Sequence, residues 1–522
     1  MNKKQHKEAA RRPHTSKVGS FGGVTLLFFF LLAWLWASWW MGDVFRVAYE
    51  RSFFAPDATL MHWLVQKQMG WMLVAGRALL TLWRWPLAGG LLVALLLTAA
   101  SWLTGRCLRL SGCLLWLRYV PATGWLMWTS HVGLNLYYMA EPGRILGVPA
   151  LYVAALALLA FALRLFTGKP HSRPAASWRW AVGEALFVVL CFGLCVWHQQ
   201  ARHPYLRPLT RMQVQLLHDD FAGMSATAHE NADLCNRHVA GYYAIALART
   251  GQLADRLFDI RLDFDTISAR DYHGWSSQCL NYHVVDCDYH AGLYRAARHY
   301  VMEDMTMAGP SLFSLKYLAK IALLDGDWVL ARKYFHIIRK APFEGPFLRR
   351  FEPMAGHPEL VQADPELAAV LGMAPPLHTF EQFHLKPAFL GYYANLKVFK
   401  TKEALIWSTM ACLYAKRMPD FLQRCGQLIG SSLPRSIAEG LAIAAVKEPG
   451  VLKAFPQLEM QMDFLDGFVR DSQPYMQDRE AGADVLFERY KGYYPYYYFF
   501  GNIRNARKPG DDEQRQNNAG VN

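Results

Sequence analysis

Long apolar runs alternate with short polar segments over the first 200 residues, and this pattern predicts membrane-spanning helices. A helix needs about 20 predominantly apolar residues to cross the hydrocarbon core of a bilayer. Five runs approach this length with no charged residue or almost none. We therefore predict a membrane domain over residues 24–200, with about five spans at 24–41, 86–103, 113–130, 147–163 and 180–197.

The third of these spans is the least regular, because it contains Arg118 and Pro121. A proline is tolerated inside a span where neighbouring helices satisfy the freed carbonyl group. An arginine near the end of a span can extend its charged head to the interface. We expect Arg118 to behave in this way; the alternative is an anion contact within the membrane.

The number of spans decides on which side of the membrane the rest of the chain lies. Residues 61–83 are semi-apolar, but their charges recur among tryptophans and leucines, which favours an interfacial or re-entrant helix over a sixth span. Residues 1–23 form a basic tail, which the positive-inside rule places in the cytoplasm. Five spans then place the chain after residue 200 outside the cytoplasm, whereas six would keep it inside.

From residue 205 onward the apolar positions follow the period of soluble helices. They recur at spacings of three and four on both sides of Asp325-Gly326-Asp327, which predicts a helical hairpin over residues 314–338. Its small residues Ala319 and Ala331 suit close helix contact, as in a tetratricopeptide hairpin. Similar hairpins are predicted at 241–260 and 404–429, and one helix at 216–229.

The spacing of these hairpins departs from a strict 34-residue period, so the repeats are degenerate. The sequence thus predicts an all-α protein: an N-terminal multi-span transmembrane helix bundle followed by a degenerate tetratricopeptide-like α-solenoid over residues 205–503. Residues 504–522 are polar and predicted to be disordered. A stack of hairpins exposes a concave surface, which commonly binds a protein or peptide.

Composition narrows the choice of partners. The net charge is +13, but the basic residues are dispersed and several flank apolar runs. This distribution favours contact with the lipid bilayer, and we expect no nucleic-acid partner. We also expect no cofactor. Nine cysteines without paired CxxC spacing indicate neither a disulfide scaffold nor a zinc ribbon.

The strongest metal candidate is the series Cys279, His283, Cys287 and His290, whose residue types suit zinc. On a straight helix the first and last of them lie about 16 Å apart along the axis, so one ion would require a bend. We expect ordinary helix side chains here and assign no metal. The alternative, a disulfide between the two cysteines, requires this segment to be a loop.

Other candidate residues are weighed against simpler roles. The acidic and histidine residues His218, Asp219 and Asp220 suit acid–base chemistry, as do Asp271 and His273, but such residues are common at helix ends. No serine or cysteine nucleophile lies in a recognisable turn, so we assign no catalytic residue. The aromatic run at 490–501 is expected to pack the last helix against the repeats rather than bind sugars or lipid.

Residues 288–338 resemble a family of uncharacterised inner-membrane proteins of Bacteroidota-type bacteria, classed as a domain of unknown function. The likeness rests on the following features: Tyr289-His290-x-Gly292, Ala297, Glu303, the Leu-Ala-x-x-x-Leu hairpin, and the aromatic ending at 493–501. The family has an N-terminal multi-span region and a C-terminal helical-repeat region. The resemblance implies this organisation and an inner-membrane location, but no reaction.

We therefore expect a multi-pass inner-membrane protein with a periplasmic helical-repeat domain that binds a protein or peptide and is not an enzyme. The alternative is a membrane enzyme or accessory factor of envelope glycan or lipid assembly. The acidic residues available to it in the outer segments are Asp43, Glu50, Asp57 and Glu141.

Overall fold

A computed structural model of the chain describes residues 21–132, 142–167, 178–232, 237–262, 276–376, 390, 393–394 and 396–501. Regular secondary structure in this part of the chain is entirely helical, which confirms the all-α prediction. The chain divides into two compact units. The bundle unit consists of the described residues within 1–42, 85–132 and 145–202, and the helical unit of those within 43–84, 133–144 and 203–522.

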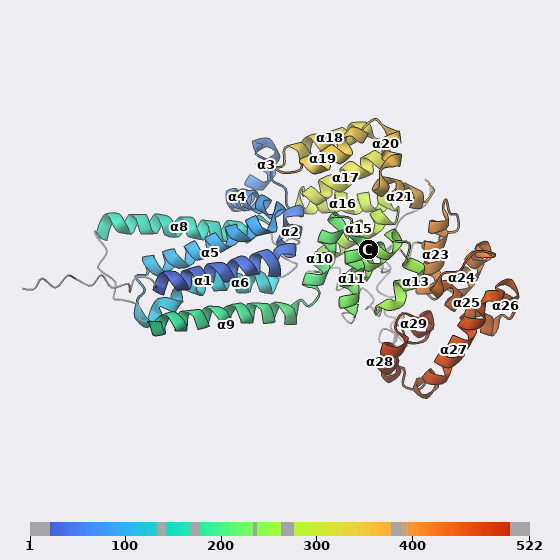
Figure 1. The fold of residues 1–522 in the computed structure, drawn as a ribbon. Helices are drawn as coiled ribbons and strands as arrows, with labels where there is room; N and C mark the ends of the chain where they lie inside the picture. Colours follow the sequence, from blue (N-terminus) through green and yellow to red (C-terminus); the bar gives the residue numbers. More distant parts are fainter. Residues whose placement is uncertain are drawn as a thin grey trace, which may run out of the picture. The chain divides into compact units, whose positions relative to one another are not determined.

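The bundle unit contains four helices that are long and apolar enough to cross a membrane, at Gly22–Trp40, Pro86–Cys107, Gly143–Leu165 and Trp178–Arg202. They belong to α1 (Phe21–Leu35) with the π-helical η2 (Trp36–Trp40), α5 (Pro86–Cys107), α8 (Gly143–Thr167) and α9 (Trp178–Arg202). The predicted span at 113–130 is divided between the 3₁₀ helix η4 (Gly112–Tyr119) and α6 (Val120–Val132). Pro121 lies at the start of α6, where its missing N–H costs no intrahelical bond. The helices of this unit run side by side (Figure 1).

The segment between α1 and α5 folds into the helical unit as α2 (Gly42–Glu50), α3 (Ala58–Val65), α4 (Gly70–Leu80) and η3 (Thr81–Arg84). The helix expected over 61–83 is broken at Met69, whose φ is 60°. Its two pieces have 8 and 11 residues. At 1.5 Å per residue they are about 12 and 16 Å long, too short to cross a bilayer.

The helical unit continues with antiparallel helices joined by tight turns (Figure 1). The predicted hairpin at 314–338 is confirmed, because α17 (Leu312–Leu324) and α18 (Trp328–Arg339) flank the turn at Gly326. The Asp327 carboxylate caps α18 by accepting from Leu330 N–H. The helices of this part are α10 (Leu206–Leu217), α11 (Phe221–Glu230), α12 (Arg237–Arg249), α13 (Leu253–Arg256), η6 (Leu257–Asp259), α15 (Ser276–His290), α16 (Tyr294–Ala308), α17 (Leu312–Leu324), α18 (Trp328–Arg339), α19 (Gly345–Phe351), η7 (Glu352–Met354), α20 (Pro358–Ala363) and α21 (Pro365–Met373).

The helix predicted at 216–229 differs from the structure, because the left-handed residue Asp219, at φ 55°, separates α10 from α11. Asp220 then caps α11 by accepting from Gly223 N–H. The hairpin at 404–429 is confirmed as α23 and α24. The remaining helices are α23 (Lys402–Tyr414), α24 (Met418–Cys425), η8 (Gly426–Leu428), α25 (Arg435–Lys447), α26 (Gly450–Ala454), η9 (Pro456–Leu458), α27 (Glu459–Ser472), η10 (Gln473–Tyr475), α28 (Arg479–Tyr490) and α29 (Tyr494–Phe500).

The aromatic run at the end of the helical unit packs inward, as predicted. Tyr494, Tyr497 and Phe500 of α29 are all buried. The Tyr494 hydroxyl donates to the carbonyl of Leu413 at 3.1 Å, and its ring lies 5.1 Å from that of Phe258. The run therefore joins α29 to α23 and η6 instead of forming an exposed platform.

Gly292 is expected to tolerate no side chain. Its φ is +82°, and an added Cβ would lie 2.5 Å from the carbonyl carbon of Met373, in the backbone itself. Gly251 also has a left-handed φ of +72°, but nothing lies within 4 Å of its Cβ position. We expect Gly251→Ala to cost about 1–2 kcal/mol from backbone strain, and Gly292→Ala about 2–5 kcal/mol because packing strain is added. Thermal unfolding followed by circular dichroism compares the two, and equal losses would contradict the close approach.

Candidate functional site

A cavity of about 310 Å³ lies within the helical unit. The helices that line it come from distant parts of the sequence: α2, α10, α15, α17, α19 and α21. Among the described residues its lining has six cationic and five carboxyl side chains. The cations are Arg46, Arg51, Arg84, Lys316, Lys320 and Arg350, and the carboxyl groups are those of Glu50, Asp219, Asp286, Glu344 and Glu366.

Lys316 holds two carboxylates together on one side of the cavity. Its Nζ lies 2.7 Å from Oε2 of Glu50 and 2.9 Å from Oε2 of Glu344. Arg46 pairs with the other oxygen of Glu50 at 3.1 Å, and the Tyr49 hydroxyl donates to Glu344 at 2.5 Å. Burial alone would raise the pKa of Glu50, but Lys316 and Arg46 lower it below its ordinary value. Glu50 is therefore ionised, and its ion pairs with Lys316 and Arg46 fix the cluster in place.

Glu366 anchors the opposite side. It accepts from Lys320 Nζ at 2.7 Å and from the Tyr289 hydroxyl at 3.1 Å, and its second oxygen lies 3.3 Å from Arg350. Burial opposes ionisation, but Lys320 and its other cationic neighbours lower the pKa of Glu366 to about 2. Arg350 also binds Asp364, just behind the lining, at 3.0 Å.

Asp286 differs from these acids, because burial raises its pKa. Its carboxyl group accepts from the hydroxyls of Tyr242 and Tyr317, the latter at 2.5 Å. Arg51 opposes the effect of burial without reversing it, and stacks on the Phe313 ring at 3.6 Å. The pKa of Asp286 is thus shifted in the opposite direction to the pKa values of Glu50 and Glu366 in the same lining.

The structure separates the members of the proposed metal series. His283 Nε2 lies 3.3 Å from the Cys287 thiol, and the His283 ring packs against His238. His290 instead lines the cavity, and burial lowers its pKa to about 3, so it is neutral. The side chain of Cys279 lies outside the described residues, and within them no group of three or more histidine, cysteine or acidic residues could hold a metal ion.

The alternative of a disulfide between Cys279 and Cys287 is wrong. Both residues belong to the continuous helix α15. Eight residues of α-helix rise about 12 Å, well beyond the Cα separation of roughly 7 Å that a disulfide allows. Cys287 is accordingly a free, buried thiol.

The acid–base candidates are dispersed. His218 and Asp219 lie at the cavity, where Asp219 pairs with Arg350 at 3.6 Å, whereas Asp220 is a helix cap. Asp271 and His273 lie outside the described residues.

The acids predicted for an envelope enzyme are dispersed too. Glu50 lines the cavity, whereas Asp57 caps α3 and pairs with Lys340 at 2.6 Å. Asp43 lies near Arg207 and Arg211, and Glu141 is not described. Glu50 is therefore the one described member of this set that belongs to the cavity.

In the bundle unit, the prediction that Arg118 extends its charged head to the membrane interface is wrong. It is buried, and its Nη2 lies 2.6 Å from Oε2 of Glu184 and 2.7 Å from the Thr25 hydroxyl. The same nitrogen also contacts the Tyr119 hydroxyl at 2.9 Å. A charged side chain that is buried away from water needs such partners. Glu184, rather than water at the membrane interface, therefore stabilises the charge of Arg118.

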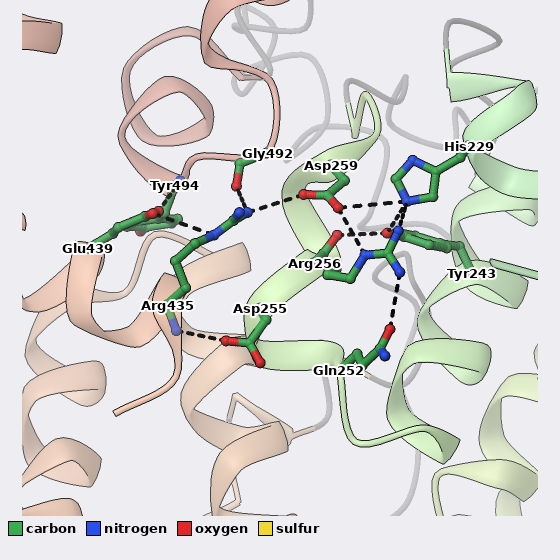
Figure 2. A network of polar contacts seen from close by, with 10 residues as sticks. All are labelled: His229, Tyr243, Gln252, Asp255, Arg256, Asp259, Arg435, Glu439, Gly492 and Tyr494. Atoms are coloured by element: carbon green, nitrogen blue, oxygen red, sulfur yellow. Dashed lines mark hydrogen bonds and ion pairs between the residues drawn. The ribbon is translucent and has the colours of Figure 1, made fainter. Parts of the chain in front are cut away.

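A second polar network joins α13 and η6 to the last helices of the helical unit, as Figure 2 shows. Asp259 accepts from Arg256 Nε at 3.2 Å and from Arg435 at 3.1 Å, while Asp255 accepts from the backbone N–H of Arg435 at 2.8 Å. Glu439 accepts from the backbone N–H of Tyr494 at 2.7 Å. Apart from the local bond between Arg256 and Asp259, these bonds connect residues 55–180 positions apart and hold α25 and α29 against α13 and η6.

Glu439 is expected to make the stability of this network depend on pH. Burial raises its pKa to about 7, from an ordinary value of 4.5. The folded protein therefore holds an extra proton between pH 4.5 and 7, and stability falls as pH rises through this window, on the order of 2 kcal/mol. Glu439→Gln lacks the titrating group, so the wild-type free energy of unfolding minus that of the variant should fall between pH 4.5 and 7.5. Unfolding curves over this range measure it, and a constant difference would contradict the assignment.

These features describe an all-α protein whose described residues include four helices long and apolar enough to cross a membrane and a helical unit with a charge-lined cavity. The chain belongs to DUF6057, a family of unknown function, whose family model matches residues 211–501. The match includes the segments on which the predicted resemblance rests. No curated protein and no solved structure matches the chain significantly.

Proposed function

We propose that this protein belongs to a Bacteroidota-type bacterial inner membrane, where it displays stacked, tetratricopeptide-like hairpins in the periplasm and binds a protein or peptide partner without catalysing a reaction. The observation that carries this proposal is the cavity in the helical unit. Its ion pairs fix the lining side chains before any partner arrives, which lowers the entropic cost of binding.

The size of the cavity favours one group of a larger partner. Pockets that enclose a whole small ligand range over about 300–1,000 Å³. At about 310 Å³ this cavity is at the lower end of that range. One side chain or the terminus of a peptide fits such a volume, with the rest of the partner lying on the surrounding helices.

The packing of residues 43–84 supports an odd number of membrane crossings. The backbone N–H of Leu312 donates to the carbonyl of Ser52 at 2.9 Å, and Glu50 pairs with Lys316. Residues 43–84 and the residues after 203 thus form one unit and belong on one side of the membrane. An even number of crossings between them is then required. The helices α5, α8 and α9 supply three of these crossings, so we count the stretch η4–α6 as the fourth. Together with α1, the chain then crosses the membrane five times.

Labelling a cysteine introduced at position 520 tests the side. In intact spheroplasts, Gly520→Cys should react with a membrane-impermeant maleimide, whereas Gln5→Cys in the basic tail should react only after permeabilisation. The unmodified protein serves as the blank, because Cys113, its exposed cysteine among those described, is expected on the cytoplasmic side. Labelling of Gly520→Cys only after permeabilisation would place the helical unit in the cytoplasm.

Photo-crosslinking in living cells tests the partner. A photoreactive amino acid at Leu217, which lines the cavity and is 44% exposed, should give an adduct of defined mass. The same residue at Met460, 74% exposed and outside the lining, is the matched control. Equal adduct patterns from the two positions would argue against a partner at the cavity.

The alternative, an enzyme or accessory factor of envelope glycan or lipid assembly, is favoured by one observation. The pKa of Glu50 is lowered while burial raises the pKa of Asp286 in the same cavity, and acid–base catalysis uses carboxyl groups whose pKa values are shifted apart. Asp286→Asn keeps the size of the side chain but cannot transfer a proton. Loss of envelope glycan in a strain with normally folded Asp286→Asn would support the enzyme, and unchanged glycan would support the binding protein.

A further inference from the structure

We infer that the cavity holds a carboxylate group of the partner, contributed by an acidic side chain or by the C-terminus of a peptide. This inference rests on the proposed function and adds the chemistry that the site recognises. It is carried by the charge of the lining and by one buried donor that has no acceptor.

The lining has more positive than negative charge. Lys316, Lys320 and Arg350 are matched by Glu50, Glu344, Glu366 and Asp219, with Asp364 behind them. Arg46 shares Glu50, and Arg51 stacks on an aromatic ring. Asp286 accepts hydrogen bonds from two tyrosine hydroxyls, and burial raises its pKa, while His290 is neutral. With Asp286 included, the lining therefore has six cationic side chains and five carboxyl groups, one more positive group than negative.

Two arginines are placed to receive an anion. Arg46 is 5% exposed, and its Nη1 has no hydrogen-bond partner among the described residues. A buried guanidinium nitrogen without an acceptor costs free energy that an incoming oxygen removes. Arg84 also lines the cavity, is half-buried, and has no ion pair within the described part of the chain. An acceptor in the cavity would complete the hydrogen bonding of Arg46 and balance the charge of Arg84.

Other ligand classes fit the lining less well. A cation would increase the existing positive excess. A phosphate group carries about 1.5–2 negative charges near neutral pH, more than the single excess cationic group of the lining balances, and Glu50, Glu344 and Glu366 would repel it. A carboxylate carries one charge and takes two hydrogen bonds in the plane that guanidinium groups favour. Phe313 and Phe347 in the lining provide apolar contact for the carbon atoms that bear it.

Small acid and amide pairs test this inference on the purified full-length protein in nanodiscs. N-acetylglutamate N-methylamide represents an acidic side chain and N-acetylalanine a peptide C-terminus; the corresponding glutamine compound and N-acetylalaninamide are the neutral controls. Ligand-observed NMR titration should show at least tenfold tighter binding of an acid than of its amide. The acid that binds more tightly identifies the source of the group. Equal binding of acid and amide, or tighter binding of inorganic phosphate than of both acids, would overturn the inference.

Variants locate the probe in the cavity. Arg84→Gln removes the cationic group that has no ion pair among the described residues. It should therefore weaken binding of the acid at least fivefold and leave binding of the amide unchanged. Arg46→Lys keeps the positive charge beside Glu50 but lacks the Nη1 donor, so it should also weaken binding of the acid. The exposed Lys333→Gln, outside the lining, is the matched control and should bind as the wild type does. Wild-type affinity in folded Arg84→Gln would exclude the cavity as the carboxylate site.

The two tests separate the inference from the function on which it rests. A specific adduct at Leu217 without preference for acid over amide would leave the binding function standing and remove the carboxylate. Selective binding of the acid without an adduct at Leu217 would leave the carboxylate site and remove the protein or peptide partner.

Discussion

Lys316→Met should destabilise the helical unit by about 3–5 kcal/mol, because it leaves buried carboxylates without their cation. The Lys316 side chain is 12% exposed and lies between Glu50 and Glu344, which are 5% and 1% exposed. Arg46 still pairs with Glu50 in the variant, so the greater loss falls on Glu344. Denaturant or thermal unfolding of the full-length protein in detergent measures the change.

The stability lost in Lys316→Met should depend on pH in a defined direction. In the wild type, Lys316 lowers the pKa of Glu50 and thereby stabilises the folded protein. This contribution to stability is present above the ordinary pKa of 4.5 and declines as pH falls below it. Without Lys316, burial raises the pKa of the carboxyl groups, so the variant gains stability on protonation. The difference between wild type and variant should therefore be largest above about pH 6 and shrink towards pH 4.

Lys340→Met provides the matched control. Lys340 also forms a pair at 2.6 Å, with Asp57, but its side chain is 38% exposed and that of Asp57 is 23% exposed. Exposed pairs contribute about 0–1 kcal/mol, because water screens them and solvates each charge. If both lysine variants lose the same stability, the cluster at Lys316 is not a buried ion network.

The sequence predicts those features that local patterns determine. Runs with no charged residue or almost none predict the four long apolar helices, because a membrane span is defined mainly by its length and hydropathy. The hairpin of α17 and α18 follows from the spacing of apolar residues around Gly326. The inward packing of α29 follows from the cost of exposing so many rings.

The cavity could not be predicted in this way, because its contacts join distant residues. Glu50 and Lys316 are 266 positions apart, and nothing in the sequence states that α2 packs on α17. A weaker signal was present: Arg46, Glu50 and Arg51 lie in the short segment after the first predicted span. Three charges among apolar neighbours indicate buried partners, but they do not identify them.

The partner of Arg118 was missed although the sequence contains a signal for it. Arg118 is the charged residue of the third predicted span, and Glu184 that of the fifth. Ionisable residues within membrane spans generally pair with one another. Two opposite charges in separate spans therefore indicate an ion pair, which the explanation by extension to the interface overlooked.

Glu184→Ala should strongly destabilise the bundle unit. The Arg118 and Glu184 side chains are 8% and 4% exposed, and the distance between Nη2 and Oε2 is 2.6 Å. Removing the carboxylate leaves a buried guanidinium with the hydroxyls of Thr25 and Tyr119 as its remaining side-chain partners, at a cost of about 3–5 kcal/mol. We expect lower yield in the membrane and a lower midpoint of thermal unfolding in detergent.

The double variant Arg118→Met, Glu184→Met distinguishes loss of the pair from loss of packing. Replacing a buried ion pair by apolar side chains of similar volume is often neutral or stabilising, because neither charge then has to leave water. The double variant should therefore recover most of the stability that Glu184→Ala loses. Arg164→Met, at an exposed position of α8, is the control and should change stability little. If the double variant is as unstable as Glu184→Ala, the uncompensated charge of Arg118 is not the cause. If the double variant recovers stability but gives no adduct in cells with the photoreactive residue at position 217, the ion pair serves partner binding more than folding. Charged residues within membranes often have such functional roles.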